Sequence, residues 1–237
     1  MDDMKRIGIM QPYFFPYLGY FQLIHAVDEF VFYDDVAYIK RGWINRNRIL
    51  VNGQPTYITV PCKKVSQNRL ICDTEINMSG KERRKLCKTM EMAYKKAPHF
   101  TDVYPLFEAM IMEPFSTISA LNIASTREVC HYLGIKTRFT VSSEAFDNQA
   151  MDRADRLIDI CQHLGGTQYL NAIGGQELYE KDYFRERGVD LYFLQAGKVT
   201  YPQWDKQDFV PWLSVLDIMM FNDPAIIVEF LDEFTLV

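Results

Sequence analysis

A strand, a helix and a second strand fit into the first 33 residues of the chain, and this unit constrains the fold more than any other feature. A short apolar run over residues 6–10 ends at Gln11 and Pro12, where a proline stops strand pairing. Apolar residues then recur at helical spacing over residues 17–27, and residues 29–33 form a second apolar run. Two strands joined by a helix within about 30 residues are typical of a βαβ unit with parallel strands. The sequence therefore predicts an α/β fold.

The middle of the chain interrupts this alternation. Two β-rich runs flank Asn52 and Gly53, a pair that favours a hairpin turn. Ser79 and Glu82 have the spacing of a capping box, which predicts the start of a basic helix, and two more helices are expected after it. Residues 44–133 are therefore predicted to form an inserted hairpin followed by helices.

Strands and helices alternate again after the insertion. The predicted strands are 135–141, 167–171 and 189–194, and the predicted helices are 151–164, 181–187, 211–221 and 224–234. Five strands joined by helices are typical of a doubly wound, Rossmann-like sheet. We therefore expect one α/β domain over residues 1–237, with a mainly parallel five-stranded sheet and C-terminal helices over about 211–237.

The composition excludes several classes of protein. Hydrophobic residues make up 48% of the 237 residues and the net charge is only -5, so the chain can bury a core and disorder is not expected. No apolar run approaches the roughly 18–20 residues of a membrane helix, and the start lacks the apolar core of a signal peptide. The five cysteines include no C-x-x-C pair and no histidine at zinc spacing, so no metal site is predicted. We expect a soluble, cytoplasmic protein.

Aromatic and basic residues are concentrated near the start of the chain. Eleven of the 33 aromatic residues lie within residues 13–43, and the first hundred residues carry 16 basic against 10 acidic residues. Ligands of open α/β sheets bind beyond the carboxyl ends of the strands. The loop that follows each predicted strand is therefore the place to search for a site, and a basic first half favours a phosphate-bearing ligand.

The loop after the first strand brings an amide and three tyrosines to the start of a helix. Gln11, Tyr13, Tyr17 and Tyr20 have polar tips, and the free N–H groups and dipole of a helix N-terminus favour an anion. An aromatic cluster packed over the helix start is the alternative, but it accounts only for the apolar half of the loop. We expect these four side chains to form the floor of a substrate pocket.

Two carboxylates and several cations follow the second strand. Asp34 and Asp35 can hold a ribose, a metal or an amine, and the alternative is that one of them caps a helix or pairs with an arginine. Lys40, Arg46 and Arg48 can each pair with a phosphate or a carboxylate. We expect Asp34, Asp35 and Lys40 to be the catalytic groups.

The stretch that contains Trp43, Asn45, Arg46 and Asn47 is too polar for a core and too aromatic for an ordinary loop. It offers a stacking plane together with amide and guanidinium donors, and we expect these residues to bind substrate. A nucleic-acid patch and a contact between copies of the chain in a homo-oligomer are equally weighted alternatives.

Paired glycines follow a later predicted strand. Gly174 and Gly175 can bring backbone N–H groups close to a substrate, and a purely structural turn is an equal alternative. The chain contains neither G-x-G-x-x-G nor a P-loop pattern, so neither of these nucleotide motifs is predicted.

The same segments resemble the WbqC-like protein family. The resemblance is carried by MQPYFFPYLGYFQLI at 10–24, DDV at 34–36, KRGWINRN at 40–47, DRLI at 155–158, GG at 174–175 and SVLD at 214–217. It therefore covers nearly the whole chain. The family is associated with bacterial surface-polysaccharide (O-antigen) gene clusters, in which nucleotide-linked amino sugars are made and decorated. The resemblance implies a role in polysaccharide biosynthesis without naming a reaction.

A more distant likeness is to the H-x-G-H nucleotidyltransferases, whose two histidines contact a triphosphate at the start of the first helix. Here Tyr17 and Tyr20 stand at the two histidine positions. Tyrosine can donate a hydrogen bond but carries no positive charge, so this likeness implies that Lys40, Arg46 or a metal would stabilise the transition state. It supports a nucleotidyltransferase-type fold more strongly than the activity, with ATP or another nucleotide as the candidate cofactor.

These observations lead us to expect a transferase that binds a nucleotide or nucleotide-linked amino sugar and acylates or aminoacylates the sugar amine. A non-catalytic sugar-nucleotide binding module is the alternative, because the sequence shows no nucleophile paired with a base. RNA binding through residues 43–48 is a weaker alternative, because nucleic acid would need a more basic chain.

Overall fold

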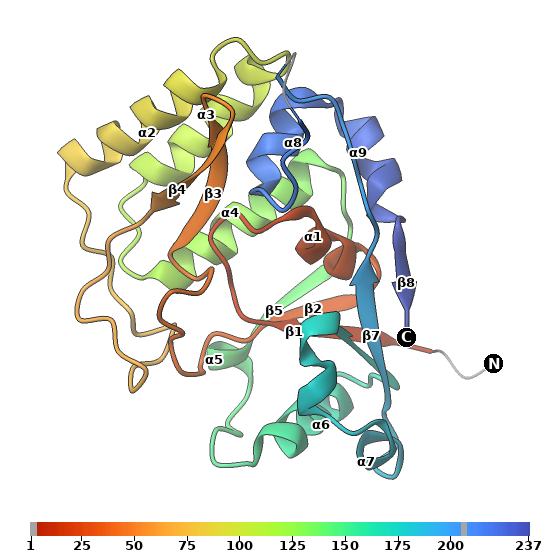
Figure 1. Ribbon diagram of the computed structural model, residues 1–237. Helices are drawn as coiled ribbons and strands as arrows, with labels where there is room; N and C mark the ends of the chain where they lie inside the picture. Colours follow the sequence, from red (N-terminus) through yellow and green to blue (C-terminus); the bar gives the residue numbers. More distant parts are fainter. Residues whose placement is uncertain (1–3, 205–207) are drawn as a thin grey trace.

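The computed structural model describes residues 4–204 and 208–237, which form a mixed α/β fold (Figure 1). The main sheet has the strand order β5-β2-β1-β6-β7-β8. Its strands are β1 (Arg6–Met10), β2 (Glu29–Phe32), β5 (Arg138–Val141), β6 (Gln168–Ala172), β7 (Asp190–Ala196) and β8 (Phe234–Leu236). The first five run parallel to one another, and β8 runs antiparallel to β7. The predicted α/β class is confirmed.

The main sheet has six strands, one more than the five predicted. The apolar run over residues 224–234 predicts a helix, but α9 (Pro224–Leu231) ends earlier and the chain then turns into β8. Leu194 pairs with Leu236 and Ala196 with Phe234. The short strand β8 thereby covers the edge of β7, which would otherwise expose unpaired N–H and C=O groups. A strand of three residues is too short to show the alternation of apolar and polar residues from which a strand is predicted.

Helices cover both faces of the sheet (Figure 1). One face carries α1 (Leu18–His25), α4 (Ile118–Tyr132), α8 (Val215–Phe221) and α9, and the other carries α6 (Arg153–His163) and α7 (Lys181–Arg185). The strands supply side chains to both faces by alternation: Phe30 and Phe32 of β2 join the core around α1, and Val31 joins the core around α6.

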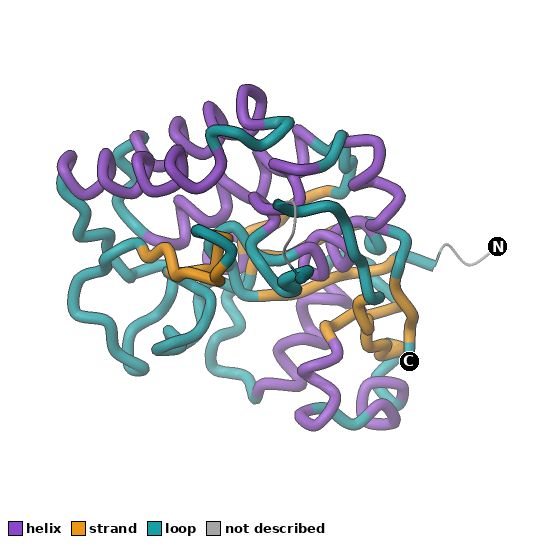
Figure 2. Tube along the Cα trace, turned by 45° about the horizontal axis from the view of Figure 1, so that its top comes forward, coloured by secondary structure: helices purple, strands orange, loops and turns teal. Residues whose placement is uncertain are grey.

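A hairpin and helices are inserted between β2 and β5. The inserted elements before α4 are β3 (Arg46–Val51), β4 (Gln54–Thr59), α2 (Gly80–Tyr94) and α3 (Phe100–Met112). Asn52 and Gly53 both have a positive φ, 49° and 75°, as a tight hairpin turn of this kind requires. Ser79 and Glu82 form the predicted capping box. The strands β3 and β4 form a two-stranded sheet separate from the main sheet. In Figure 2 the strands, drawn in orange, lie between helices, drawn in purple.

The strand order reverses between β1 and β6, because β2 and β5 extend the sheet on one side of β1 while β6 and β7 extend it on the other. In open α/β sheets, ligands bind in the crevice outside the carboxyl ends of the strands at such a reversal. Two short elements follow strand ends directly, α5 (Ser142–Ala145) after β5 and the 3₁₀ helix η1 (Ile173–Leu178) after β6. None of the helices in residues 4–204 and 208–237 combines the length and apolar character needed to cross a membrane.

Candidate functional site

Three segments meet at the carboxyl edge of the sheet and line two adjoining pockets. They are the aromatic loop (residues 11–17), the tryptophan segment (residues 42–48) and the post-β7 segment (residues 197–204 and 208–214). The α1 pocket, of about 280 Å³, lies between the start of α1 and the post-β7 segment. The Arg48 pocket, of about 180 Å³, is lined by Tyr13, Pro16, Tyr17, Trp43, Asn47, Arg48 and Trp212. Small-molecule sites span roughly 300–1,000 Å³, which the two pockets reach only together.

A strained turn in the aromatic loop is held from two sides. Phe15 has a φ of 39°, in the left-handed region that a bulky residue rarely adopts. Its carbonyl oxygen accepts hydrogen bonds from Asn47 Nδ2 at 2.6 Å and from Ser214 Oγ at 2.7 Å. Asn47 Nδ2 also donates to the Phe14 carbonyl at 3.1 Å. The buried Asn47 therefore fixes the loop that carries the tyrosines, in addition to lining the Arg48 pocket.

The aromatic loop is also tied to the tryptophan segment. The backbone N–H of Phe14 donates to the Trp43 carbonyl at 3.0 Å. The fully buried Asn122 of α4 donates through Nδ2 to the carbonyls of Pro12 (2.9 Å) and Ile44 (2.7 Å). These bonds hold the pocket walls in place without a ligand, which lowers the ordering cost of binding.

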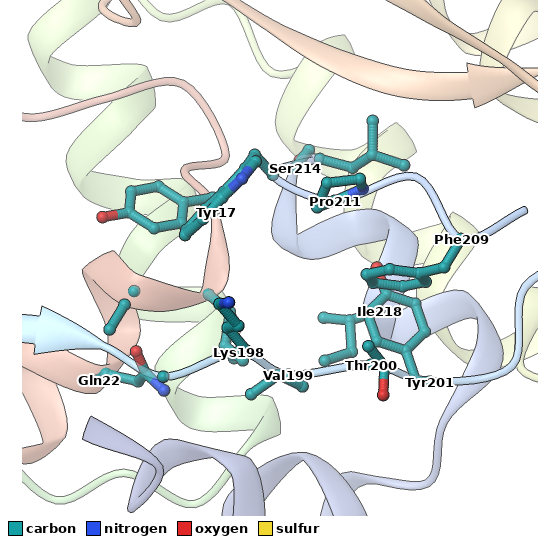
Figure 3. A pocket seen from close by; sticks show the side chains of 16 residues that line it. Tyr17, Gln22, Lys198, Val199, Thr200, Tyr201, Phe209, Pro211, Ser214 and Ile218 are labelled. Atoms are coloured by element: carbon teal, nitrogen blue, oxygen red, sulfur yellow. The ribbon is translucent and has the colours of Figure 1, made fainter.

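Tyr17 and Trp212 form the boundary between the pockets, since both residues line both cavities. Their rings meet edge to face, with centroids 5.7 Å apart. The Tyr17 ring lies across Gly19, where an added Cβ would be 2.7 Å from Cζ and 2.8 Å from the hydroxyl oxygen of Tyr17. In Figure 3 the Tyr17 ring lies on the opposite side of the α1 pocket from Phe209 and Tyr201. The glycine of the Tyr-Leu-Gly-Tyr motif thus makes room for the tyrosine.

The variant Gly19→Ala tests this role. The new methyl group must push the Tyr17 ring out of its place. The affinity for the nucleotide-linked amino sugar that the sequence leads us to expect should therefore fall about tenfold or more, measured by isothermal titration. Gly80→Ala is the matched control, because a Cβ on Gly80 would meet only the Arg84 side chain at 3.6 Å. Ligand binding in Gly19→Ala equal to that in Gly80→Ala would contradict the assignment.

Arg48 supplies the positive charge of the Arg48 pocket. Its guanidinium donates to the Trp212 carbonyl at 3.1 Å, and its Cζ lies 5.7 Å from the Trp43 ring centroid. The buried Nε has no hydrogen-bond partner among the described residues. Trp212 itself has a φ of 60°, an uncommon conformation that tends to cluster at ligand sites. The arginine is thus held between two tryptophans with donors left for an anion.

The tyrosines beside Arg48 remain hydrogen-bond donors. Burial raises the pKa of Tyr13, with a further contribution from Tyr17, and burial raises the pKa of Tyr17. Both hydroxyls therefore stay protonated at neutral pH. Tyr20 is 2% exposed and donates to the Gln11 carbonyl at 2.9 Å, while the Gln11 side chain faces the Tyr13 hydroxyl at 3.4 Å. Tyr20 and Gln11 thus shape the loop and do not line either pocket.

Asp34 and Asp35 are buried and bind side chains of other elements; of their four carboxylate oxygens, only Oδ1 of Asp35 lacks a hydrogen-bond partner among the described residues. Asp34 accepts hydrogen bonds from the hydroxyls of Ser119 (2.8 Å) and Ser143 (3.0 Å), and from the Ser143 backbone N–H. Asp35 forms a buried ion pair with Arg156 and accepts from Gln149 at 2.9 Å. Pairing with an arginine is an alternative role that the sequence predicts for one of these carboxylates, and Asp35 has this role. Neither carboxylate lines the α1 pocket or the Arg48 pocket.

The other predicted cations and amides lie outside the pockets. Lys40 is exposed, and Asn45 donates to the Val60 carbonyl at 2.8 Å. Arg46 donates to the Gly42 carbonyl at 3.2 Å and lies over the Tyr57 ring, with Cζ 4.6 Å from its centroid. Among the predicted substrate-binding residues, the structure therefore brings Tyr13, Tyr17, Trp43 and Asn47 together.

Gly174 and Gly175 lie in η1, directly after β6. A Cβ on Gly175 would collide with the amide of Asn171, with Cγ at 3.1 Å, so this position requires the close approach that only glycine permits. A Cβ on Gly174 would meet open space. Neither glycine lines the two pockets.

The post-β7 segment contributes residues that the sequence did not identify. Lys198, Tyr201 and Trp212 line the α1 pocket, as does Gln22 of α1. The position of this loop after a parallel strand pointed to it, but no motif marked individual residues. The sequence predicts that Arg48 can pair with an anion, but it predicts the same for Lys40 and Arg46 and does not distinguish the three.

A buried carboxylate fixes the post-β7 segment to the rest of the fold. Asp217, fully buried at the start of α8, accepts from the hydroxyls of Tyr94 (2.6 Å) and Tyr201 (2.7 Å) and from Gln203 Nε2 (2.8 Å). Burial raises the pKa of Asp217. Since Tyr201 lines the α1 pocket, this network sets the position of one pocket wall. Within the described ranges, no three His, Cys, Asp or Glu side chains are grouped to hold a metal ion.

Comparison with known proteins places these pockets within a shared sequence pattern. The profile of the WbqC-like protein family matches residues 11–228, a range that contains every residue lining the two pockets. A protein of Mycobacterium tuberculosis (strain ATCC 25618 / H37Rv), described as "Uncharacterized protein Rv1507c", is 33% identical over 225 residues, which cover 92% of this chain and 94% of that protein. No solved structure shows a significant match.

Proposed function

The chain belongs to the WbqC-like protein family, and we propose that it binds a nucleotide-linked amino sugar across its two pockets and transfers an acyl or aminoacyl group to the sugar amine. The observation that carries the proposal is the meeting of an apolar pocket and a cationic pocket at the N-terminus of α1. A nucleoside diphosphate sugar has the same division, because it joins an aromatic base to a polar sugar through phosphates.

Each part of such a ligand has a matching surface. The α1 pocket is walled by Leu18, Val199 and Ile218 and by aromatic rings, which suits a nucleobase. The phosphates would lie at the boundary, near Arg48 and the first N–H groups of α1, where no side chain caps the helix. The amino sugar would occupy the Arg48 pocket, against the Trp43 ring and the Tyr13 hydroxyl. The strand order, which reverses beside β1, agrees with ligand binding at this edge.

The proposed reaction needs an activated acyl donor, such as an acyl adenylate formed from ATP. The sugar nitrogen attacks the acyl carbon, a C–N bond forms, the bond to AMP breaks, and the amine loses a proton to a base. Asp34 could accept this proton only after leaving its present partners, and the unpaired Oδ1 of Asp35 is buried in a residue that lines neither pocket. In the proposal the two carboxylates therefore organise the edge of the sheet, and the pocket residues align the reactants.

Replacement of Arg48 tests the phosphate contact. Arg48→Met is expected to weaken the binding of a nucleoside diphosphate sugar about 10- to 100-fold, because a charge-assisted hydrogen bond contributes about 1.5–3 kcal/mol. Isothermal titration at 50 and 300 mM salt measures the effect, and the salt dependence should be smaller in the variant. Arg84→Met, a change at an exposed cation of α2, is the control.

Arg46→Met separates the sequence expectation from the structural one. Arg46 lies over Tyr57 outside both pockets, so its replacement should weaken binding less than the replacement of Arg48. The phosphate assignment would be wrong if Arg46→Met abolished binding while Arg48→Met bound like the wild type.

A non-catalytic binding module is the second candidate, and one observation favours it. Among the described residues, neither pocket is lined by a carboxylate or a histidine that could act as a base. Incubation with ATP, a carboxylic or amino acid and a nucleotide-linked amino sugar separates the two candidates. A transferase that activates its donor releases pyrophosphate and AMP and adds the acyl mass to the sugar, whereas a binding module does neither.

A further inference from the structure

A buried acceptor without a partner lies in the wall of the α1 pocket. Gln22, in α1, is 1% exposed and lines this pocket. Its Nε2 donates to the carbonyl oxygens of Phe230 (2.8 Å) and Glu233 (2.9 Å). Its Oε1 is buried and has no hydrogen-bond partner within residues 4–204 and 208–237.

The orientation of this amide is fixed by chemistry. Only the NH₂ group can face two carbonyl oxygens, because an amide oxygen in that place would repel both of them. The Gln22 oxygen must therefore point away from Phe230 and Glu233. Buried polar atoms are nearly always paired in native proteins, so an unpaired acceptor in a pocket wall points to a ligand that brings a donor.

The surroundings of Gln22 define the rest of that ligand. Figure 3 shows Gln22 next to Lys198 on one side of the pocket, with Phe209 and Tyr201 on the far side. An apolar, ring-lined cavity suits a flat heterocycle, and the buried acceptor requires an N–H on its edge. A simple hydrocarbon chain would leave Oε1 unpaired.

We infer that the α1 pocket is a nucleobase subsite and that Gln22 Oε1 accepts a hydrogen bond from an N–H on the edge of the base. The inference rests on the proposed function and deepens it, because it assigns the base and the specificity of its recognition. The ligand class is a nucleotide whose base presents a ring N–H or an exocyclic amine to Gln22. Gln22 acts here as a specificity-determining residue and takes no part in bond making.

Titration with matched nucleotides tests the inference on the unaltered protein. The probes are UDP, CDP and ADP, each compared with its N-methylated analogue: 3-methyl-UDP, N4,N4-dimethyl-CDP and N6,N6-dimethyl-ADP. For the nucleotide that binds most tightly, methylation should weaken binding about tenfold or more, because it removes the N–H and leaves Oε1 unpaired. Equal binding of parent and methylated nucleotides within threefold would overturn the inference.

The variant Gln22→Met separates a lost hydrogen bond from a steric effect. Methionine has a similar size but no acceptor oxygen. The variant should therefore bind the parent nucleotide about tenfold more weakly, and its affinities for the parent and the methylated nucleotide should lie within threefold of each other. A methylation effect as large in Gln22→Met as in the wild type would assign the loss to crowding and overturn the role of Gln22. Gln162→Met is the control, since the exposed Gln162 also donates to a backbone carbonyl, that of Arg187 at 2.7 Å.

Different results would contradict the proposed function and the Gln22 contact. If none of the three parent nucleotides binds at millimolar concentration, and GDP and dTDP do not bind either, the proposed function and this inference are both wrong. If a parent nucleotide binds and Arg48→Met weakens it, but methylation has no effect, the proposed function stands and only the Gln22 contact is wrong.

Discussion

Arg156→Met is expected to lower the free energy of unfolding by about 3–5 kcal/mol, because it leaves the buried carboxylate of Asp35 without its cation. Arg156 is 5% exposed and Asp35 is 4% exposed, so water can replace little of the lost interaction. The guanidinium also donates to Asn148 at 2.7 Å and lies over the Tyr33 ring, with Cζ 4.6 Å from its centroid. Urea unfolding followed by circular dichroism measures the loss.

The control for this prediction lies on the same helix. Arg153 is exposed in the first turn of α6, and Arg153→Met should change the free energy of unfolding by less than about 0.5 kcal/mol. The double variant Asp35→Asn, Arg156→Met should recover part of the loss, because it removes the unpaired charge as well. A loss below about 1 kcal/mol for Arg156→Met alone would show that Asp35 does not depend on the ion pair.

Asp217→Ala is expected to destabilise the fold by about 3–5 kcal/mol, because three donors, one of them fully buried, lose their acceptor together. The donors are the hydroxyls of Tyr94 and Tyr201 and the amide of Gln203. The Tyr94 hydroxyl also accepts from the backbone N–H of Leu50 at 2.8 Å, so the network reaches from the hairpin to the post-β7 segment. Asp217→Asn keeps one acceptor oxygen, so its free energy of unfolding should fall by less than that of Asp217→Ala. Equal unfolding midpoints for Asp217→Ala and the wild type would contradict this account.

The pH dependence of stability isolates the burial of this carboxyl group. Burial raises the pKa of Asp217 in the folded protein, so the folded state keeps the proton at pH values where the unfolded state has released it. The contribution of Asp217 to the free energy of unfolding therefore falls as the pH rises above about 4, the ordinary value for aspartate. Relative to Asp217→Asn, the wild type should therefore lose free energy of unfolding as the pH rises above about 4. A relative gain would mean that the hydrogen bonds outweigh burial.

The sequence predicted those parts of the fold that depend on local patterns. The βαβ start, the turn at Asn52 and Gly53 and the capping box at Ser79 each rest on a few neighbouring residues, and the structure contains all three. The strand β8 was missed because its pairing with β7 depends on contacts with a segment about 40 residues away in the chain. Turn chemistry is visible in a sequence, whereas the covering of a sheet edge is decided by tertiary contacts.

The two pockets lie at the edge of the sheet where the sequence predicts a site, and some of the predicted residues line them. Tyr13, Tyr17, Trp43 and Asn47 line the Arg48 pocket, because they lie close to each other on two loops that follow parallel strands. Trp212 could not be predicted, since it joins them from a segment that follows β7.

The partners of the two carboxylates were equally invisible in the sequence. Asp35 is 121 positions from Arg156, and Asp34 binds Ser119 and Ser143 from two other elements. Paired carboxylates after a strand predict a polar site, but the sequence does not show whether their partners come from a ligand or from the chain. The WbqC-like motifs contain both members of the Asp35–Arg156 pair, which the structure shows in contact.

The most direct test of the central claim is a crystal structure of the protein with a nucleoside diphosphate amino sugar at saturating concentration. The account predicts phosphate oxygens within hydrogen-bond distance of the Arg48 guanidinium and of the N–H groups that begin α1, with the base in the α1 pocket. Ligand density at another place, such as beside Asp34 and Asp35, with both pockets empty, would contradict it.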